Sequence, residues 1–272
     1  MNLRQIHHGI SCTDIVQTKR ALRAIGFSQY QPGAPEPLVF RNQEDDFIGQ
    51  VTAPVLGDEY HTHYVENPDT GQQIDLIEIQ PAGLKPRDWS HPAQGDLIIG
   101  IQVPDPAAAY SAMQSADPSC SYCPPEPWDD NGAIVFDWRD RQRSVLTSDE
   151  PFAILHYTPE FFESAQRFFE EVLEVPVTQI DAQSYRLEGI KGRLEIRLTS
   201  KAKVLDFSQW GKRYPGANHF RLIERSIAGI SQGIERTGLG GFIIPPQNGF
   251  AFLHGPCGEA IETFDLDFPS TA

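Results

Sequence analysis

Short apolar segments and amphipathic helix patterns alternate along the chain in an order that recurs four times. The first recurrence opens with an apolar segment at 5–14, followed by a helix pattern over 15–25 whose apolar residues repeat at helical spacing. Asp14 and Gly26 stand where such a helix needs its N-cap and its C-cap. The segments that follow predict strands at 38–40, 47–53, 61–66 and 72–79. The turn sequence NPDTG joins the last two strands as a hairpin.

The plan of one strand, one helix and two or more strands repeats three more times. Thr158 followed by Pro159 marks the start of the third helix, because proline is favoured at the first helical position. The turn at 256–258 predicts a final hairpin. The expected segments are 97–103, 105–116, 132–138 and 143–148 in the second recurrence, 152–158, 159–173, 184–189 and 193–200 in the third, and 218–224, 226–238, 249–255 and 259–266 in the fourth.

Four units of this kind predict an α+β fold of mixed sheets with helices on the outside. Proline-rich and polar segments at 81–95, 148–151 and 207–217 separate successive units. The middle one is the natural boundary, and it gives two domains of two units each, 1–148 and 151–272. A length of 272 residues suits two domains of ordinary size.

Charge and composition narrow the classes of partner. A net charge of −15 argues against nucleic acids and anionic membrane surfaces, which need a basic face. No apolar run reaches the roughly 18 residues of a membrane span, and no basic segment with an apolar core opens the chain, so a cytoplasmic protein is expected. Cys120 and Cys123 form a C-x-x-C pair, but no second pair completes a zinc site.

The repeated unit resembles that of the vicinal oxygen chelate superfamily. The stretches that carry the resemblance are IHHGISCTD, YVENPDTGQQIDLIEI, NHFRLIE and FLHGPCGEAIE. The superfamily includes glyoxalase I, fosfomycin-resistance proteins, methylmalonyl-CoA epimerase and extradiol ring-cleaving dioxygenases. The resemblance implies tandem domains whose four βαβββ-like units form cupped mixed sheets.

The resemblance also implies a metal site, with a histidine on the first strand of a unit and a carboxylate on its last strand. The first unit offers His7 or His8, and Asp75; the fourth offers His219 and Glu262. The second unit has Ile98 in place of the histidine, with Ser144 or Val145 in place of the carboxylate, and the third has only Glu195. In some members units pair across domains, so His7, His219 and Glu262 are the expected ligands, with Asp75 as a fourth.

The period-two pattern favours His7 over His8 as the ligand. His8 shares its row with Ile10 and Cys12, whereas His7 shares its row with Gly9 and Ser11, which leave room above the sheet. Some ring-cleaving members carry a His-His pair whose second histidine is the ligand, so His8 stays open as the alternative.

Other polar residues allow two interpretations each. His61 and His63 share one face of their strand and either line the cavity or form a polar rim. Glu78 is expected on the solvated face opposite Asp75. Glu195 is expected to be a relic of a ligand position or a surface charge.

Two histidines and one carboxylate form the facial triad of non-haem Fe(II) oxygenases, so the resemblance favours a ring-cleaving dioxygenase with Fe²⁺. The departures are Phe252 and Asn218, which stand where that subgroup has a tyrosine and a second histidine. A glyoxalase-like lyase or isomerase would instead use both carboxylates with Mn²⁺, Zn²⁺, Ni²⁺ or Co²⁺, and Glu262 would double as the catalytic base. A metal-free drug-binding protein is the third class. A small-molecule substrate is the expected partner in all three, and pairing of two copies as a homodimer stays open.

Overall fold

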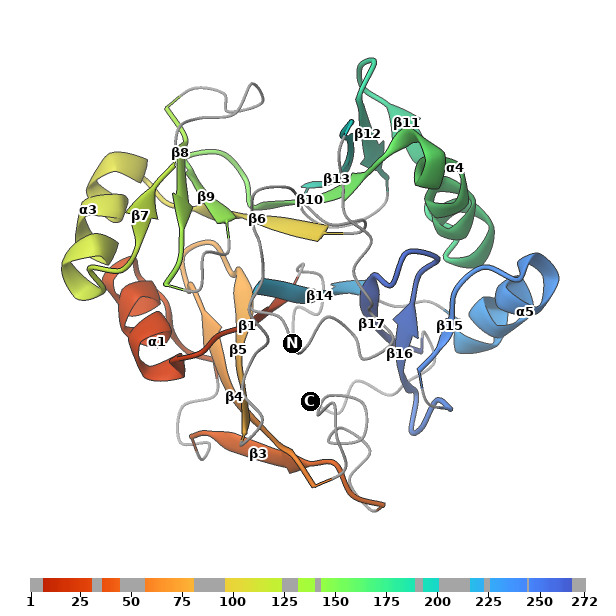
Figure 1. Cartoon of the computed structure of the whole chain (residues 1–272), viewed down its shortest axis with the longest axis horizontal. Helices are drawn as coiled ribbons and strands as arrows, with labels where there is room; N and C mark the ends of the chain where they lie inside the picture. Colours follow the sequence, from red (N-terminus) through yellow and green to blue (C-terminus); the bar gives the residue numbers. More distant parts are fainter. Residues whose placement is uncertain are drawn as a thin grey trace.

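The computed structural model describes residues 7–30, 36–44, 57–80, 96–123, 132–139, 143–188, 193–200, 216–222, 226–243 and 245–265. Within these residues the chain forms four units in the expected order, each with a strand first and a helix second (Figure 1). The helices lie at the outside of the molecule and the strands fill its middle.

The first two units follow the predicted segments closely. Asp14 caps the first helix, since its Oδ1 accepts a hydrogen bond from the backbone N–H of Gln17 at 3.0 Å. The elements of the first unit are β1 (His7–Ser11), α1 (Ile15–Ala24), β2 (Ser28–Gln29), β3 (Leu38–Arg41), β4 (Glu59–Glu66) and β5 (Gln73–Gln80), and those of the second are β6 (Asp96–Gln102), α3 (Pro106–Ala116), β7 (Ser121–Tyr122), β8 (Ile134–Asp137) and β9 (Arg143–Thr147).

The last two units repeat the arrangement. Thr158 is the N-cap residue and precedes Pro159 at the helix start, as predicted, although its side chain makes no capping hydrogen bond. The elements of the third unit are β10 (Phe152–Tyr157), α4 (Pro159–Arg167) continued by the π-helix η1 (Phe168–Val172), β11 (Val177–Gln179), β12 (Ser184–Leu187) and β13 (Arg193–Leu198), and those of the fourth are β14 (Gly216–Leu222), α5 (Ile227–Thr237), β15 (Gly241–Phe242), β16 (Phe250–His254) and β17 (Ala260–Phe264).

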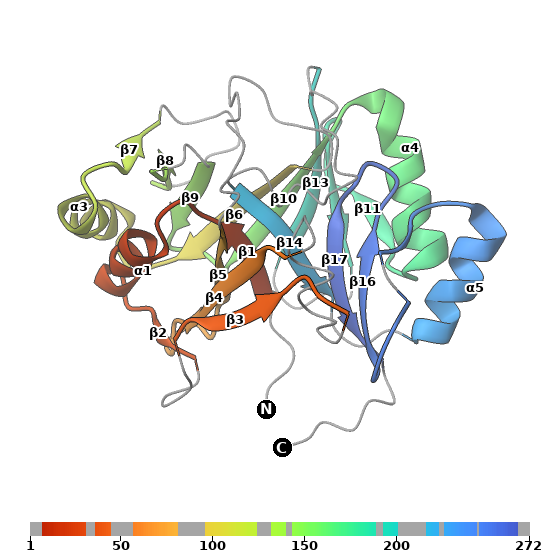
Figure 2. The same ribbon diagram turned by 60° about the horizontal axis from the view of Figure 1, so that its bottom comes forward.

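Strand pairing joins the first unit to the fourth and the second unit to the third. β1 lies between β5, to which it is parallel, and β14, to which it is antiparallel. β14 in turn pairs with β17 in parallel. In the same way β6 and β10 pair antiparallel, each flanked by its own parallel last strand, β9 and β13. A single residue pair, Ala217 with Leu97, links the two sheets through β14 and β6 (Figure 2).

The main core lies between the sheets and the helices. Residues of β1 such as Ile10 pack there with Leu22 of α1, and Leu194 and Ile196 of β13 pack there with Phe168 and Phe169. Among the described residues no helix covers the opposite face of either sheet, and the side chains that alternate with the core residues point to that face.

Some predictions fall on residues outside the ranges above. These are the strand at 47–53 and most of the separators 81–95 and 207–217. The division into domains 1–148 and 151–272 stays a prediction, because strand pairing runs across it. Among the helices that can be described, none has the length and apolar character to cross a membrane.

Candidate metal centre

The two adjacent histidines of β1 point to opposite faces of the sheet. His8 pairs with Ile74 and Phe220, both core residues, and it is fully buried on the helix side. Burial, with a smaller contribution from His7, lowers the pKa of His8 from 6.5 to about 3, so this imidazole is neutral. Neither of its ring nitrogens has a hydrogen-bond partner among the described residues. His7 lies on the face free of helices, which agrees with the orientation expected from the sequence.

His219 reaches the same face from the neighbouring strand. It stands opposite Gly9 in the β1–β14 pair, just before a register irregularity between Gly9 and Ile10. Because Gly9 has no side chain, the imidazole of His219 has room beside His7, and the two rings lie 5.5 Å apart between centroids. Phe252 of β16 packs edge-on against the other side of His219, at 5.6 Å between ring centroids. Two strands far apart in the sequence therefore deliver the two imidazoles.

Glu262 comes from the last strand of the fourth unit. It stands beside Arg221 of β14, two residues beyond His219, so its side chain shares the face of His219. The carboxylate is buried, as both histidines are, with exposed fractions of 2% for His7, 3% for His219 and 6% for Glu262. A buried carboxylate is costly unless a cation or hydrogen-bond donors compensate it.

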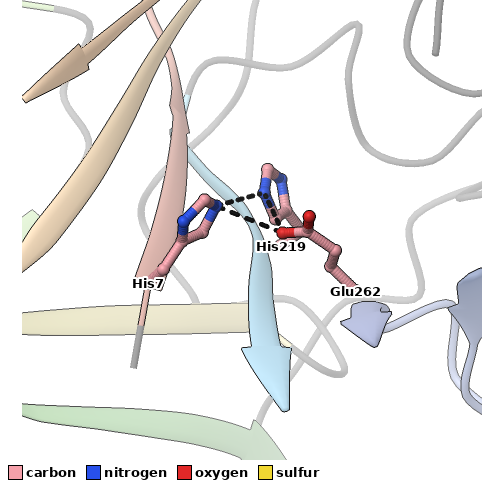
Figure 3. Close-up of side chains that lie close together, drawn as sticks. All are labelled: His7, His219 and Glu262. Atoms are coloured by element: carbon pink, nitrogen blue, oxygen red, sulfur yellow. Dashed lines mark hydrogen bonds and ion pairs between the residues drawn. The ribbon is translucent and has the colours of Figure 1, made fainter. Parts of the chain in front are cut away.

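The donor atoms of these three residues converge (Figure 3). Nε2 of His7 lies 3.4 Å from Nε2 of His219 and 3.3 Å from Oε2 of Glu262, and the remaining side of the triangle is 3.9 Å. Ligand atoms bound to one ion at about 2.0–2.2 Å are themselves about 3.0–3.5 Å apart at ordinary coordination angles. The three side chains thus fit a divalent ion in donor type, and two of the three separations lie in this range, while that between His219 and Glu262 is longer by about 0.4 Å.

Asp75 approaches the same histidine from β5. Its Oδ2 lies 2.8 Å from Nε2 of His7, closer than any other carboxylate oxygen. The donor atoms of His7, His219 and Glu262 all lie within 4.8 Å of one another, and Asp75 is not part of that group. Asp75 therefore borders the triad on the side of the first unit. This position agrees with the sequence analysis, which gave Asp75 as the fourth candidate ligand.

Two tyrosines on β4 share the face of Asp75 and were not singled out in the sequence. Tyr64 stands directly opposite Asp75, and Tyr60 lies on the same face four residues earlier in the strand. Burial raises the pKa of Tyr60 well above 10, and the nearby Tyr64, Asp75 and Glu262 raise it further, so the phenol keeps its proton. The signal was present: Tyr60 and Tyr64 alternate with the histidines of the same strand.

His61 and His63 lie on the other face of β4 and do not line the site. His61 Nε2 contacts Glu59 Oε2 at 2.9 Å, which agrees with the interpretation as a polar rim. His63 contacts Nζ of Lys19, from α1, at 3.0 Å. Glu78, also on the face away from Asp75, accepts a hydrogen bond from Gln80 and is partly exposed, as expected.

The second sheet has no equivalent cluster among its described residues. The strand pairings put Ile98, Phe152, Val145 and Glu195 at the positions of His7, His219, Asp75 and Glu262. The expectation that Glu195 is a surface charge is wrong. Its side chain is only 7% exposed, and it contacts three arginines that strands β12 and β13 place around it.

Comparisons with known proteins find the fold but no close relative. No family model matches the sequence, and no curated protein matches it. Two crystal structures of glyoxalase I from Zea mays, one of them a mutant, match with TM-scores of 0.59 and 0.58 at 12% identity, covering 97% of this chain and 92% of theirs. The cppA protein of Streptococcus pneumoniae TIGR4 matches with a TM-score of 0.52 at 10% identity, covering 96% of this chain and 97% of its own.

These matches extend over both halves of the chain. Together with the four strand–helix–strand units, they confirm the predicted α+β architecture. The chain therefore shares the fold of these structures, glyoxalase I among them, as the resemblance in the sequence implied.

Proposed function

We propose that the chain is a metal-dependent enzyme that holds one divalent ion with His7, His219 and Glu262 and acts on a small molecule with two neighbouring oxygens. The observation that supports this most is the convergence of two imidazole nitrogens and one carboxylate oxygen, all buried, from strands of the first and fourth units.

The ion, when bound, would supply Lewis-acid or redox chemistry at an open side of the site. The chain's own residues prepare that side. Asp75 offers a carboxylate next to the triad as a proton acceptor, and Tyr60 offers a phenol that keeps its proton. Phe252 packs against His219 and limits the directions in which that imidazole can turn.

A ring-cleaving dioxygenase with Fe²⁺ is the first candidate reaction class. The supporting observation is that the mutually close donors number three, two histidines and one glutamate, with Asp75 outside the group. Because Phe252 has no hydroxyl group, it cannot donate a proton beside His219. A phenolic proton donor would have to come from the tyrosines of β4 instead.

A lyase or isomerase of the glyoxalase type is the second candidate. It is favoured by the 2.8 Å contact between Asp75 and His7, which puts a second carboxylate within reach of the same ion. In that reaction class Glu262 or Asp75 would remove a proton from a carbon beside a carbonyl group.

Metal analysis of the protein purified without chelators tests the proposal. We expect about one divalent ion per chain, and its loss in His219→Ala and in Glu262→Ala, because two remaining donors do not hold an ion stably. His61→Ala is the matched control, since it removes an imidazole from the outer face of β4 and should keep the ion. Absence of metal from the wild type, or equal content in all variants, would instead indicate a metal-free binding protein.

Oxygen uptake then separates the two reaction classes. A dioxygenase reconstituted with Fe²⁺ consumes O₂ with a catechol or a hydroquinone. A lyase or isomerase works without oxygen and with Mn²⁺, Zn²⁺, Ni²⁺ or Co²⁺. Lack of oxygen uptake across a panel of such phenols would favour the second class.

A further inference from the structure

Three arginines surround one buried carboxylate on the second sheet. Arg193, Glu195 and Arg197 alternate along β13, so they share the face that is free of helices, while Leu194 and Ile196 between them point into the core. Arg186 of β12 stands directly opposite Glu195 on that face. The matching positions opposite Asp75 and Glu262 in the other sheet hold Tyr64 and Phe252, so an arginine here is specific to the third unit.

Glu195 cannot satisfy the guanidinium groups that contact it. Arg186 and Arg193 both reach the same oxygen, Oε1, at 3.4 and 3.3 Å, and Arg197 reaches Oε2 at 3.8 Å. Each guanidinium carries five N–H donors, and one carboxylate offers about four acceptor positions. The Arg193 atom in this contact is Nε, which is buried; it lies within ion-pair distance of Oε1 but makes no hydrogen bond to the described residues. Three positive charges against one negative charge is a local excess in a chain of net charge −15.

The arginine side chains contact neighbouring residues and are still partly exposed to solvent. The guanidinium of Arg193 lies 4.6 Å from the ring centroid of Phe152, which fixes its plane over the apolar floor of the sheet. That floor consists of buried apolar residues, Ile98, Val135, Val145, Phe152 and Ile154. The arginine side chains are nevertheless 45%, 29% and 20% exposed, for Arg186, Arg193 and Arg197 in turn. Part of each arginine side chain is therefore open to solvent.

Other charged groups border the cluster without cancelling it. Arg143 of β9 pairs with Asp137 on its own hairpin, at 3.3 Å. His156 of β10 is fully buried, and burial lowers its pKa; Arg197 and Arg143 lower it further, and Asp96 opposes them. The backbone N–H of Gln183 lowers the pKa of Asp181, and the charge of Arg197 adds a smaller decrease. Arg186 and Arg193 both form their ion pair with the same oxygen of Glu195, so one carboxylate is shared between these two positive charges.

We propose that this face of β12 and β13 binds an oxyanion, the carboxylate or phosphate group of a small molecule, between Arg186 and Arg193. Planar guanidinium groups recognise carboxylate and phosphate oxygens through paired N–H donors. The apolar floor beside them suits the non-polar part of the same molecule. The site is separate from the candidate metal centre, and it does not depend on the reaction proposed there.

Thermal unfolding of the full chain with increasing inorganic phosphate or succinate, at constant ionic strength and pH 7, tests the proposal. A ligand that binds only the native state raises Tm in a saturable way. We expect such a rise for the wild type, and an apparent Kd at least about tenfold weaker for the double variant Arg186→Gln with Arg193→Gln, since each lost charged hydrogen bond weakens binding by about that factor. A response to phosphate, to succinate or to both identifies the group that the site accepts.

Two further variants separate a binding site from a structural ion-pair network. Arg41→Gln removes an exposed arginine paired with Glu59 on the first sheet, and it should respond as the wild type does. Glu195→Gln removes the internal carboxylate, so the anion should bind more tightly and recover stability that this variant loses. Equal Kd values in the wild type and the double arginine variant would overturn the proposal, as would absence of any anion response in both the wild type and Glu195→Gln.

Discussion

Oδ2 of Asp75 and Nε2 of His7 lie 2.8 Å apart, and that nitrogen also faces Glu262 at 3.3 Å. A single ring nitrogen thus has a carboxylate oxygen on either side. It donates one proton to them when it is protonated, and it offers its lone pair to an ion when it is not. A bound ion would displace that proton and free Asp75 to act as a further ligand or as a base.

Replacing Asp75 by asparagine distinguishes these two roles. In a centre with three ligands, Asp75→Asn should keep its metal and lose about 10²-fold to 10⁴-fold in activity, the usual effect of a lost general base. Metal content by elemental analysis and turnover are the measurements. Glu78→Gln, on the same strand but on the other face, is the control. Loss of metal together with activity would assign Asp75 as a fourth ligand.

Removal of the ion should destabilise the protein. A ligand present at 100 times its Kd stabilises the native state by about 2.7 kcal/mol, so a chelator should lower Tm by several degrees. The same chelator should leave Tm unchanged in His219→Ala, because that variant has no ion to lose. Calorimetry with and without the chelator measures both, and an equal decrease in the two proteins would contradict the assignment.

Replacement of Gly100 by alanine should destabilise the protein, whereas replacement of Gly229 by alanine should not. A Cβ on Gly100 would lie 2.3 Å from the ring of Phe152, which stands opposite it in the β6–β10 pair. Gly100→Ala should therefore cost about 1–3 kcal/mol in free energy of unfolding, and shortening Phe152 to leucine should recover part of it.

In helix α5, a Cβ on Gly229 meets nothing closer than 3.5 Å, so Gly229→Ala should stabilise by about 0.4–1 kcal/mol. Urea unfolding of the variants measures these differences.

His156 should make the protein less stable in acid. Burial lowers its pKa in the native state, so below pH 6.5 the unfolded chain binds a proton that the native protein does not. Stability is therefore lost as the pH falls below 6.5, by at most about 1.4 kcal/mol per pH unit from this group. His156→Gln should show a smaller loss between pH 7.5 and 5.5 in urea unfolding. An identical loss in the wild type and in His156→Gln would exclude His156 as the source.

Local patterns in the sequence predicted most of the secondary-structure elements and their order. Helix caps such as Asp14, the hairpin turns and the period-two rows depend on neighbouring residues, so they identified the elements and the orientation of His7 against His8. The pairing of β1 with β14 is different, because it joins residues about 210 positions apart and no local pattern encodes it. It was expected only from the resemblance to a known superfamily.

The second sheet shows where the interpretation of single residues failed. Arg193, Glu195 and Arg197 stand at alternate positions, which already indicates a shared face. Whether that face is solvent or interior depends on strand β12 and on Phe152, which lie elsewhere in the chain. Glu195 was therefore interpreted as a relic of a ligand position or as a surface charge, and the second alternative is wrong because Glu195 is the buried member of the cluster.

The pairing of β1 with β14 places the candidate ligands His7 and Glu262 near the two ends of the chain. An ion held by both would close a loop that includes nearly every residue, and such long loops gain most from a cross-link because the open chain has most freedom to lose. Opening of either terminal strand would release the ion before the rest of the molecule unfolds. The rate at which the protein exchanges its metal with a labelled ion in solution would then report how often its terminal strands separate.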